Sequence, residues 1–266
     1  MIRREREGLR WYVFASIPER SVIHGAFTRL GGVSEAPFAG LNVGKHVGDR
    51  EAAVRANHHA LAHALGVEVD RLVDAQQVHG DRVAAVTAEH AGQTLPETDA
   101  LITNVPGIWL LLRFADCVPV FLYDPIRQAV GLAHAGWKGT LAEIARKTVG
   151  AMASTYGSDP AELIVGLGPA IGSCCFEVQE DVLLPLRGHY GAVAENWVRR
   201  QADGAEHLDL WLANRWQLEN AGVVHIEESG LCTCCRQDEF YSYRGENGIT
   251  GRFAALIGLC DFEAGR

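Results

Sequence analysis

The chain has 266 residues, of which 48% are hydrophobic, and its 24 basic and 33 acidic side chains give a formal net charge of -9. A chain of this length can bury a large core, and we expect one catalytic domain over residues 1–266. The acidic balance leaves no broad cationic surface for a phosphate backbone, which argues against nucleic-acid binding.

The sequence predicts neither export nor a membrane segment. Three arginines lie within the first six residues, but the apolar run Trp11–Ile17 is too short for a signal peptide and is followed by Pro18. The apolar stretch Val105–Tyr123 is interrupted by Arg113 and Asp116, so it predicts two buried strands instead of a membrane span. We therefore expect a cytoplasmic protein.

Seven cysteines leave one unpaired under any disulfide scheme, which favours reduced thiols in the cytosol. A second metal site is one interpretation of two cysteine-rich segments. However, we do not interpret either segment as the C-x2-C spacing of a zinc ribbon or knuckle, because each contains directly adjacent cysteines, so we expect small buried hydrophobic side chains. The residues concerned are Cys174, Cys175, Cys232, Cys234 and Cys235.

The first third of the chain reads as two strands followed by a helix. Residues rich in β-branched and aromatic side chains predict strands over Leu9–Ala15 and Val22–Thr28, and Asp49 is expected to cap a helix that runs to Gly66. The loop Arg29–Gly48 contains five glycines, whose backbone can adopt positive φ and approach a ligand closely. An ordinary mobile connection remains an equal alternative.

Short apolar runs separated by turn residues predict a strand-dense middle. Thr140 and Glu143 have the spacing of a capping box, which predicts the start of a helix that reaches about Tyr156. The predicted strands are Arg82–Val86, Asp99–Thr103, Ile108–Arg113, Val118–Tyr123 and Ala129–His134.

Toward the C-terminus, helices and strands remain separated. We expect a strand over Leu163–Leu167, helices over Glu177–Leu186 and Asp209–Ala221, the second ended by Gly222, and a last strand over Phe253–Leu259. Meandering strands with separate helices favour an α+β layered fold over regular βαβ winding.

Three predicted strand ends carry a side chain that can bind a metal: His79, Cys117 and His134. We expect these strand ends to cluster on one rim. Two imidazoles and a thiolate suit zinc and leave a fourth tetrahedral position for water or substrate. The alternative is that each residue is structural, because a single histidine or cysteine usually is.

Eight segments spread over almost the whole chain match motifs of a known family: His24–Arg29, Gly31–Ser34, Leu41–Gly44, Gln77–Gly80, Ala115–Val120, His134–Thr140, Gly168–Gly172 and Thr250–Arg252. Together they resemble the YfiH family, also known as laccase-domain polyphenol oxidases, peptidoglycan editing factors and multifunctional purine nucleoside phosphorylases. One departure is that Tyr243 is followed by Arg244 and then Gly245, where family members often carry paired arginines. This departure puts any anion-binding role of the second arginine in doubt.

The resemblance implies a four-layer α/β/β/α sandwich with mixed sheets, related to the catalytic domain of cytotoxic necrotizing factor. It also implies that His79, Cys117 and His134 are the catalytic, metal-binding residues. The activity it implies is phosphorolysis of adenosine, inosine, guanosine and methylthioadenosine, with deamination of adenosine. The partners would then be a small nucleoside and phosphate, and the protein a monomer or a homodimer.

Phosphorolysis requires cations that place an anion against C1′, and both reactions require groups that move protons. Arg29 and Lys138 are our candidates for anion binding, and Asp116 and Glu177 are our candidates for proton transfer. A solvated charge or a structural hydrogen bond is the alternative interpretation of each.

Three other functions remain open. One is copper-dependent oxidation of phenols, since a His2Cys set can bind copper as the alternative metal. Against it, the chain has only two methionines and lacks the H-x-H pairs with which multicopper oxidases assemble a trinuclear copper centre. A cysteine hydrolase of peptidoglycan precursors would use Cys117 as nucleophile and His134 as base. A metal-binding interaction module would instead fill all four coordination positions of its ion.

Overall fold

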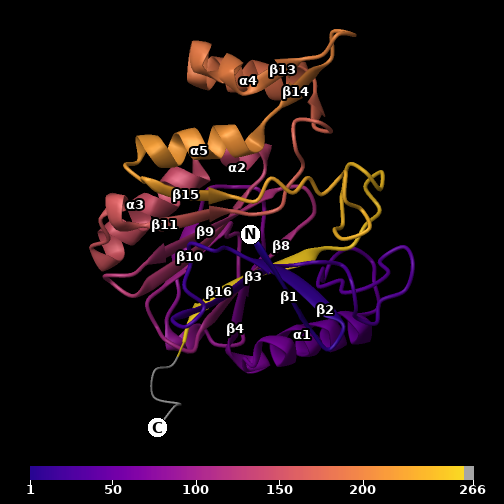
Figure 1. The fold of residues 1–266 in the computed structure, drawn as a ribbon, viewed down its shortest axis with the longest axis vertical. Helices are drawn as coiled ribbons and strands as arrows, with labels where there is room; N and C mark the ends of the chain where they lie inside the picture. Colours follow the sequence, from indigo (N-terminus) through magenta and orange to yellow (C-terminus); the bar gives the residue numbers. More distant parts are fainter. Residues whose placement is uncertain (261–266) are drawn as a thin grey trace.

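The computed structural model describes residues 1–260, and two mixed β-sheets form its centre (Figure 1). The larger sheet has seven strands in the order β1-β2-β3-β16-β8-β4-β6. Its strands are β1 (Ile2–Arg6), β2 (Leu9–Val13), β3 (Val22–Phe27), β16 (Phe253–Leu259), β8 (Trp109–Phe114), β4 (Leu72–Ala75) and β6 (Thr94–Leu95).

The second sheet has six strands in the order β15-β11-β9-β10-β7-β5, and a small sheet β12-β14-β13 lies beyond its helical side. The six strands are β15 (His225–Glu228), β11 (Ile164–Leu167), β9 (Val118–Asp124), β10 (Ala129–Ala135), β7 (Ala100–Thr103) and β5 (Val83–Ala85). The small sheet consists of β12 (Glu177–Val178), β14 (Glu206–Leu208) and β13 (Val198–Arg200).

Helices cover the outer faces of both central sheets, as Figure 1 shows. One covers the seven-stranded sheet and the others lie on the side of the six-stranded sheet. The α-helices are α1 (Glu51–Leu65), α2 (Trp137–Leu141), α3 (Ile144–Tyr156), α4 (Glu180–Tyr190) and α5 (Leu210–Asn220). The 3-10 turns are η1 (Val69–Arg71), η2 (Ala88–His90), η3 (Pro160–Glu162) and η4 (Gly191–Asn196).

Three hydrophobic cores separate these layers. On β8, Leu110 and Leu112 face the core between the sheets, whereas Trp109 and Leu111 face the core beneath α1. This alternation follows from the period of two in a strand and explains why β8 is apolar on both faces. The third core joins the six-stranded sheet to α3 and α5. The arrangement is the four-layer α/β/β/α sandwich that the resemblance implies.

Each predicted strand is confirmed, with ends shifted by at most two residues, and β16 has the predicted bounds. Several short strands escaped prediction, among them the edge strand β1 and the buried β4. Arginines fill β1, which exposes both its faces, and Asp74 interrupts the apolar pattern of β4. Predictions based on apolar runs miss such strands.

The prediction that Asp49 caps α1 is wrong. The helix begins one residue later, and Arg50 is its N-cap without a side-chain hydrogen bond. The Asp49 carboxylate instead accepts hydrogen bonds from Ser34 Oγ at 2.6 Å and Asn42 Nδ2 at 2.8 Å. It therefore ties the glycine-rich loop together. The predicted end at Gly66 is confirmed, since Gly66 has φ 71°.

The predicted capping box of Thr140 and Glu143 does not form. Thr140 lies inside α2, which begins earlier, at Trp137, and Thr140 Oγ1 accepts a hydrogen bond from Asn214 Nδ2 at 2.9 Å. Glu143 has a left-handed backbone with φ 62° and separates α2 from α3. One expected helix is thus two.

The helix predicted over Glu177–Leu186 begins only at Glu180, because Glu177 pairs with His207 in the small sheet. The helix predicted over Asp209–Ala221 is confirmed as α5, and the Asp209 side chain caps its start.

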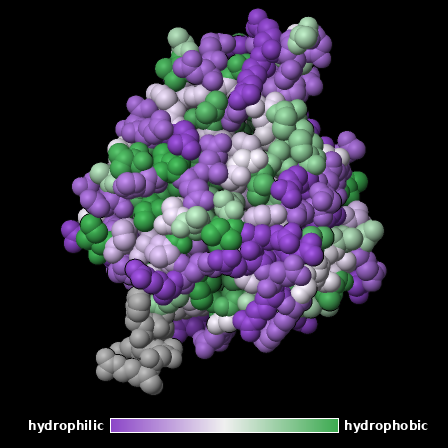
Figure 2. All heavy atoms as spheres, in the orientation of Figure 1, coloured by the Kyte–Doolittle hydropathy of each residue, from purple (hydrophilic) through white to green (hydrophobic). Residues whose placement is uncertain are grey.

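Among the described residues, each helix is too short or too polar to cross a lipid bilayer. The face drawn in Figure 2 intersperses hydrophilic residues with small hydrophobic patches and shows no continuous apolar band. Large exposed apolar side chains such as Val78, Ile126 and Leu184 belong to segments far apart in the fold.

Candidate metal centre and cavity

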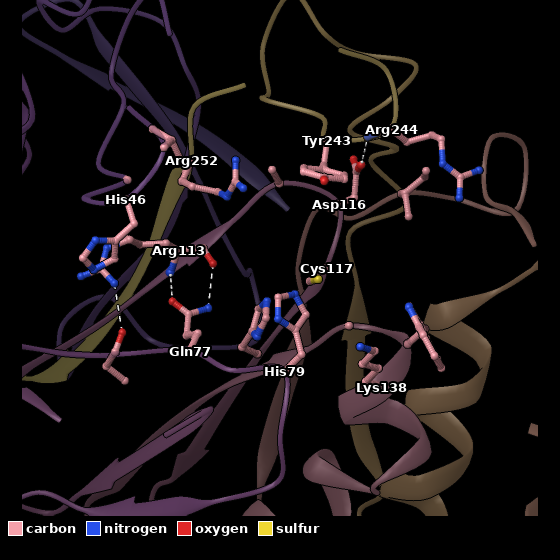
Figure 3. Close-up of a pocket in the computed structure, with 18 of the residues that line it drawn as sticks. His46, Gln77, His79, Arg113, Asp116, Cys117, Lys138, Tyr243, Arg244 and Arg252 are labelled. Atoms are coloured by element: carbon pink, nitrogen blue, oxygen red, sulfur yellow. Dashed lines mark hydrogen bonds between the residues drawn. The ribbon is translucent and has the colours of Figure 1, made fainter. Parts of the chain in front are cut away.

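His79, Cys117 and His134 meet where the two central sheets open onto a shared loop region. His79 follows β4, Cys117 immediately precedes β9, and His134 lies near the end of β10. The β9–β10 register pairs His134 with Pro119, which brings Cys117 beside the imidazole. The candidate ligand atoms of the three residues all lie within 4.8 Å of one another. Figure 3 shows the His79 imidazole next to the Cys117 sulfur.

Two residues of this centre have a strained backbone. His79 has φ 59° and Asp116 has φ 87°, both in the left-handed region that residues with a Cβ rarely adopt. Each such residue costs on the order of 1–3 kcal/mol and persists only where its surroundings hold it. The strain turns the loops that carry His79 and Cys117 toward His134.

Asp116 is held by three hydrogen bonds from the segment before β16. Its Oδ1 accepts from Thr233 Oγ1 and from Ser242 Oγ, each at 2.7 Å. Its Oδ2 accepts from the Arg244 backbone amide, also at 2.7 Å. These contacts hold the left-handed turn that presents Cys117.

The buried Asp99 connects two of the three candidate ligands. Its Oδ1 lies 2.9 Å from His134 Nδ1 and accepts the His79 backbone amide at 3.0 Å. Its Oδ2 accepts the amides of Val78 and Gly80. A proton on Nδ1 of His134 leaves Nε2 free to face Cys117, the usual arrangement of a metal-binding histidine. Although burial raises the pKa of Asp99, the hydrogen bond from His134 and its charge bring it below its ordinary value.

Cys117 and His134 form an electrostatic pair. Burial opposes ionisation of the thiol, but the charge of His134 and hydrogen bonds from His134 and His79 lower the pKa of Cys117 to about 6. Burial also opposes the charged imidazole, but Cys117 and Asp99 raise the pKa of His134 to about 9. The centre therefore favours a thiolate, the form of cysteine that binds metals and attacks electrophiles.

The donor set fits a tetrahedral zinc ion. Bonds of about 2.3 Å to sulfur and 2.0–2.1 Å to nitrogen place neighbouring ligand atoms roughly 3.5 Å apart. The 4.8 Å limit on the observed separations leaves only small side-chain rotations to reach that spacing. The carboxylate behind His134 supplies the outer partner that such sites use.

The three residues line a cavity of about 690 Å³. Gly136 lines the cavity directly against the trio, since an added Cβ would lie 2.7 Å from Cys117 Sγ and 3.2 Å from His79 Cδ2. Aromatic side chains of Trp137, Phe176 and Tyr243 form part of its wall. Its size suits a ligand of a few fused rings with a polar substituent.

Basic side chains lie on both sides of the metal centre, as Figure 3 shows. Arg113 extends from β8 and is fixed by hydrogen bonds to Val43, Ala75 and Asp74. Arg252 precedes β16, and its Nη1 donates to the Thr250 and Gly251 carbonyls. The cationic lining residues are Lys45, Arg113, Lys138, Arg244 and Arg252.

Only two of the four residues proposed for anion binding and proton transfer lie at the cavity. Lys138 and Asp116 line the cavity. Arg29 does not: its Nη1 pairs with Glu246 Oε1 at 3.0 Å, and its guanidinium lies 4.4 Å from the Tyr241 ring centroid. An anion-binding role for Arg29 therefore does not agree with its position. Glu177 is exposed and lines a smaller neighbouring hollow instead.

Sequence reasoning missed Asp99, Arg113 and Arg252 as site residues. Asp99 was only the start of a predicted strand, Arg113 only an interruption of an apolar run, and Arg252 only part of a matching motif. A charged residue inside or beside an otherwise apolar strand is the available signal, because burial of a charge requires a partner.

The expectation that the clustered cysteines are small buried residues holds only for Cys232, since Cys175 and Cys234 are partly exposed and Cys174 and Cys235 are exposed. The sulfurs of Cys174, Cys175, Cys232 and Cys235 form a second group within 4.8 Å of one another. All seven cysteines lie among the described residues and are free thiols.

The family described as multi-copper polyphenol oxidoreductase laccase matches residues 23–260. A purine nucleoside phosphorylase of Deinococcus radiodurans is 42% identical over 242 residues, covering 91% of each chain. Purine nucleoside phosphorylase YlmD of Bacillus subtilis is 38% identical over 249 residues, covering 90% of this chain and 89% of the relative.

Solved structures show the same fold. YlmD of Geobacillus stearothermophilus superposes with a TM-score of 0.91 at 37% identity, and a Bacillus licheniformis protein described as hypothetical protein YfiH with 0.90 at 38%. Each comparison covers 97% of this chain and 98% of the other. The chain therefore belongs to the multi-copper polyphenol oxidoreductase laccase family, the YfiH family that its motifs resemble.

Proposed function

We propose that the chain is a zinc-dependent purine nucleoside phosphorylase acting on adenosine, inosine, guanosine and methylthioadenosine, with adenosine deaminase activity at the same site. The observation that carries this proposal is that a metal-capable trio, aromatic walls and five basic side chains share one cavity of about 690 Å³. The names of the relatives agree with a nucleoside phosphorylase.

The proposed metal ligands are His79, Cys117 and His134, and zinc bound there would supply a Lewis acid and acidify water in the cavity. Asp99 fixes the tautomer of His134 and the loop of His79 through its four hydrogen bonds. The remaining chemistry is assigned to residues of the cavity wall.

In phosphorolysis a phosphate oxygen forms a bond to C1′ while the bond from C1′ to the purine nitrogen breaks, and the purine leaves with the electron pair. We assign phosphate binding to Arg252 and Lys138. Both line the cavity, and the side-chain hydrogen bonds of Arg252 within the protein use Nη1, which leaves Nε and Nη2 available to a ligand. Positioned cations of this kind stabilise charge that grows in the transition state.

Aromatic walls suit the purine ring. Tyr243 is exposed at the cavity mouth, and Phe176 lies beneath the Arg244 guanidinium at 5.2 Å. Aromatic faces bind flat heterocycles by stacking. Asp116 accepts three hydrogen bonds from the protein, so we assign it the task of positioning Cys117. Because Glu177 lines the neighbouring hollow instead of the cavity, we assign it no part in proton transfer.

The test is incubation of the purified protein with adenosine in the presence and absence of phosphate, followed by chromatography. We expect adenine and ribose 1-phosphate only when phosphate is present, and inosine and ammonia in both cases. If adenosine stays intact in both mixtures, the proposal fails.

Two alternatives have specific support. The family description favours a copper oxidase, in which case copper-loaded protein would oxidise phenols at a rate abolished by Cys117→Ala. The Cys117–His134 pair favours a cysteine hydrolase, in which case alkylation of Cys117 in metal-free protein would abolish hydrolysis of a peptidoglycan precursor. We further propose that the chain is a single catalytic domain, monomeric or homodimeric, and that it acts in the cytoplasm, where its free thiols would stay reduced.

A further inference from the structure

Four cysteines outside the cavity converge from two turns of the chain. Cys174 and Cys175 belong to the turn after β11, and Cys232 and Cys235 belong to the turn after β15. The sulfur of Cys235 lies 3.5 Å from that of Cys174 and 3.4 Å from that of Cys175. All four sulfurs lie within 4.8 Å of one another.

The backbone holds both turns in place without help from the sulfurs. In the first turn, the amides of Cys175 and Phe176 donate to the Gly172 carbonyl at 2.9 and 3.0 Å. In the second turn, the Arg236 amide donates to the Cys232 carbonyl at 3.1 Å. Two hydrogen bonds, from Ala170 N to Leu231 O and from Thr233 N to Ala170 O, join the turns. The convergence of the thiols is therefore built into the fold.

The spacing of Cys232 and Cys235 is the C-x2-C of zinc knuckles, which the intervening Cys234 obscures in the sequence. The sulfur of Cys232 also accepts the Gly172 amide at 3.2 Å. An amide that points at a buried sulfur stabilises a thiolate more than a thiol, as a metal ligand requires.

The separations of the sulfurs distinguish one metal ion from other uses of cysteine. A disulfide joins two sulfurs at about 2.05 Å and gives no reason for four to converge. A tetrahedral zinc ion with bonds of about 2.3 Å holds its four sulfurs roughly 3.8 Å apart, close to the 3.4 and 3.5 Å found here. An iron–sulfur cluster places cysteines on separate iron ions and so spreads them farther apart.

We propose that Cys174, Cys175, Cys232 and Cys235 bind a structural zinc ion as a tetrathiolate site, separate from the His79–Cys117–His134 centre. Four protein ligands close the coordination shell, so this ion takes no substrate. Cys234 lies between two ligands but is not a member of the group.

The position of this zinc site gives it a role in shaping the cavity. Thr233, between two of the ligands, donates to Asp116, the residue before Cys117. Phe176, next to Cys175, lines the cavity. A metal that joins the two turns would thus hold one wall of the cavity and the turn that presents Cys117.

The test measures zinc per chain in protein purified and reconstituted under reducing conditions. We expect about two zinc ions in the unmodified protein and about one in the Cys117→Ala variant, which leaves the four cysteines untouched. X-ray absorption of the Cys117→Ala protein should show sulfur ligands only, at about 2.3 Å. This arm does not depend on any enzyme activity, so it is independent of the proposed function.

A double variant, Cys232→Ser with Cys235→Ser, should lose one zinc and unfold at a lower temperature, whereas the Cys234→Ser control should keep both ions. If the double variant fails to fold, the X-ray absorption spectrum of the Cys117→Ala protein still shows whether the remaining zinc is bound by sulfur alone. Cys117→Ala protein that binds no zinc, that binds it through nitrogen, or that contains iron with sulfide would overturn the assignment.

Discussion

Side chains outside the trio hold the candidate metal centre in place. Asp99 is the main example, because its two oxygens hold His134 and three consecutive amides around His79. A ligand histidine without an outer carboxylate loses both its fixed tautomer and part of its basicity.

Replacement of Asp99 with Asn should therefore weaken zinc binding about 10–100-fold, the usual effect of losing an outer-shell partner. Competition between the protein and a chromophoric chelator measures the affinity. Asp124→Asn is the matched control, since Asp124 is buried and accepts two amides at the opposite end of β9 from Cys117. Equal zinc affinity in the two variants would contradict the role of Asp99.

The close approach of the Gly136 backbone to Cys117 leads to a second prediction. The alanine variant of Gly136 would place Cβ 2.7 Å from Cys117 Sγ, closer than real Cβ contacts, so the ligands must shift. We expect Gly136→Ala to lose zinc at the catalytic centre and activity together.

The control for Gly136→Ala is Gly150→Ala in α3, where an added Cβ meets nothing within 4 Å. Alanine there should raise stability by about 0.4–1 kcal/mol, because it restricts the unfolded chain and favours the helix. Zinc analysis and thermal unfolding compare the two variants, and full occupancy in Gly136→Ala protein would refute the steric argument.

At the scale of elements, the ends of β8 and β16 place two arginines of the cavity lining next to each other. These neighbouring antiparallel strands pair Phe253 with Phe114. Arg252 and Arg113 therefore lie at the same end of the two strands, where both line the cavity. The sequence places these two arginines far apart, so only the strand order reveals their proximity.

The Arg252→Ala variant should raise the KM for phosphate by at least about tenfold, since a hydrogen bond to a charged group contributes about 1.5–3 kcal/mol. Rates of adenine release at varied phosphate and saturating adenosine give this constant. Arg29→Ala is the informative comparison, because Arg29 lies outside the cavity lining and should leave the KM unchanged. The reverse result would restore Arg29 as the anion-binding residue.

The strand β4 adds a buried ion pair beneath the cavity. Asp74 contacts Arg113 and lies 2.7 Å from Lys45 Nζ. Burial raises the pKa of Asp74, but Arg113 and Lys45 lower it below its ordinary value. Its charge therefore stabilises the fold above pH 4, and this contribution disappears as the pH falls through the lowered native pKa.

Asp74→Asn should accordingly lower the free energy of unfolding by about 3 kcal/mol at pH 7, the order of a broken buried pair, and by progressively less as the pH falls below about 4 toward the lowered native pKa. Urea unfolding across this range measures the difference, with the exposed Asp238→Asn as control. A loss that does not change with pH would show that the ionised carboxylate is not the cause.

The same scale shows what the sequence can predict. Strands with apolar residues on both faces, such as β9 and β16, stand out because both sides of each central sheet are covered. Two of the predicted capping residues failed: Asp49 and Glu143 have the right residue type, but tertiary contacts of Asp49 and the left-handed backbone of Glu143 decide their roles, whereas Asp209 begins α5 and Gly66 ends α1 as predicted.

For the whole molecule, the trio could be predicted because its members end strands within motifs that match a known family. Three other features could not be predicted: the contact of Asp99 with His134, the position of Arg252 in the cavity lining, and the convergence of Cys232 with three other cysteines. Each depends on which segments the fold brings side by side. The four-layer sandwich places the cavity at the rim where loops from both sheets meet, so its chemistry comes from segments spread over most of the chain.

The central claim is that zinc at the trio and phosphate together release purine from a nucleoside. The most direct measurement is the rate of adenine formation from adenosine and phosphate as zinc is returned to metal-free protein, alongside the Cys117→Ala variant. We predict that the rate rises with zinc occupancy of the trio, requires phosphate, and is absent in the variant. Adenine formation that proceeds equally without zinc, or in the Cys117→Ala protein, would contradict the account.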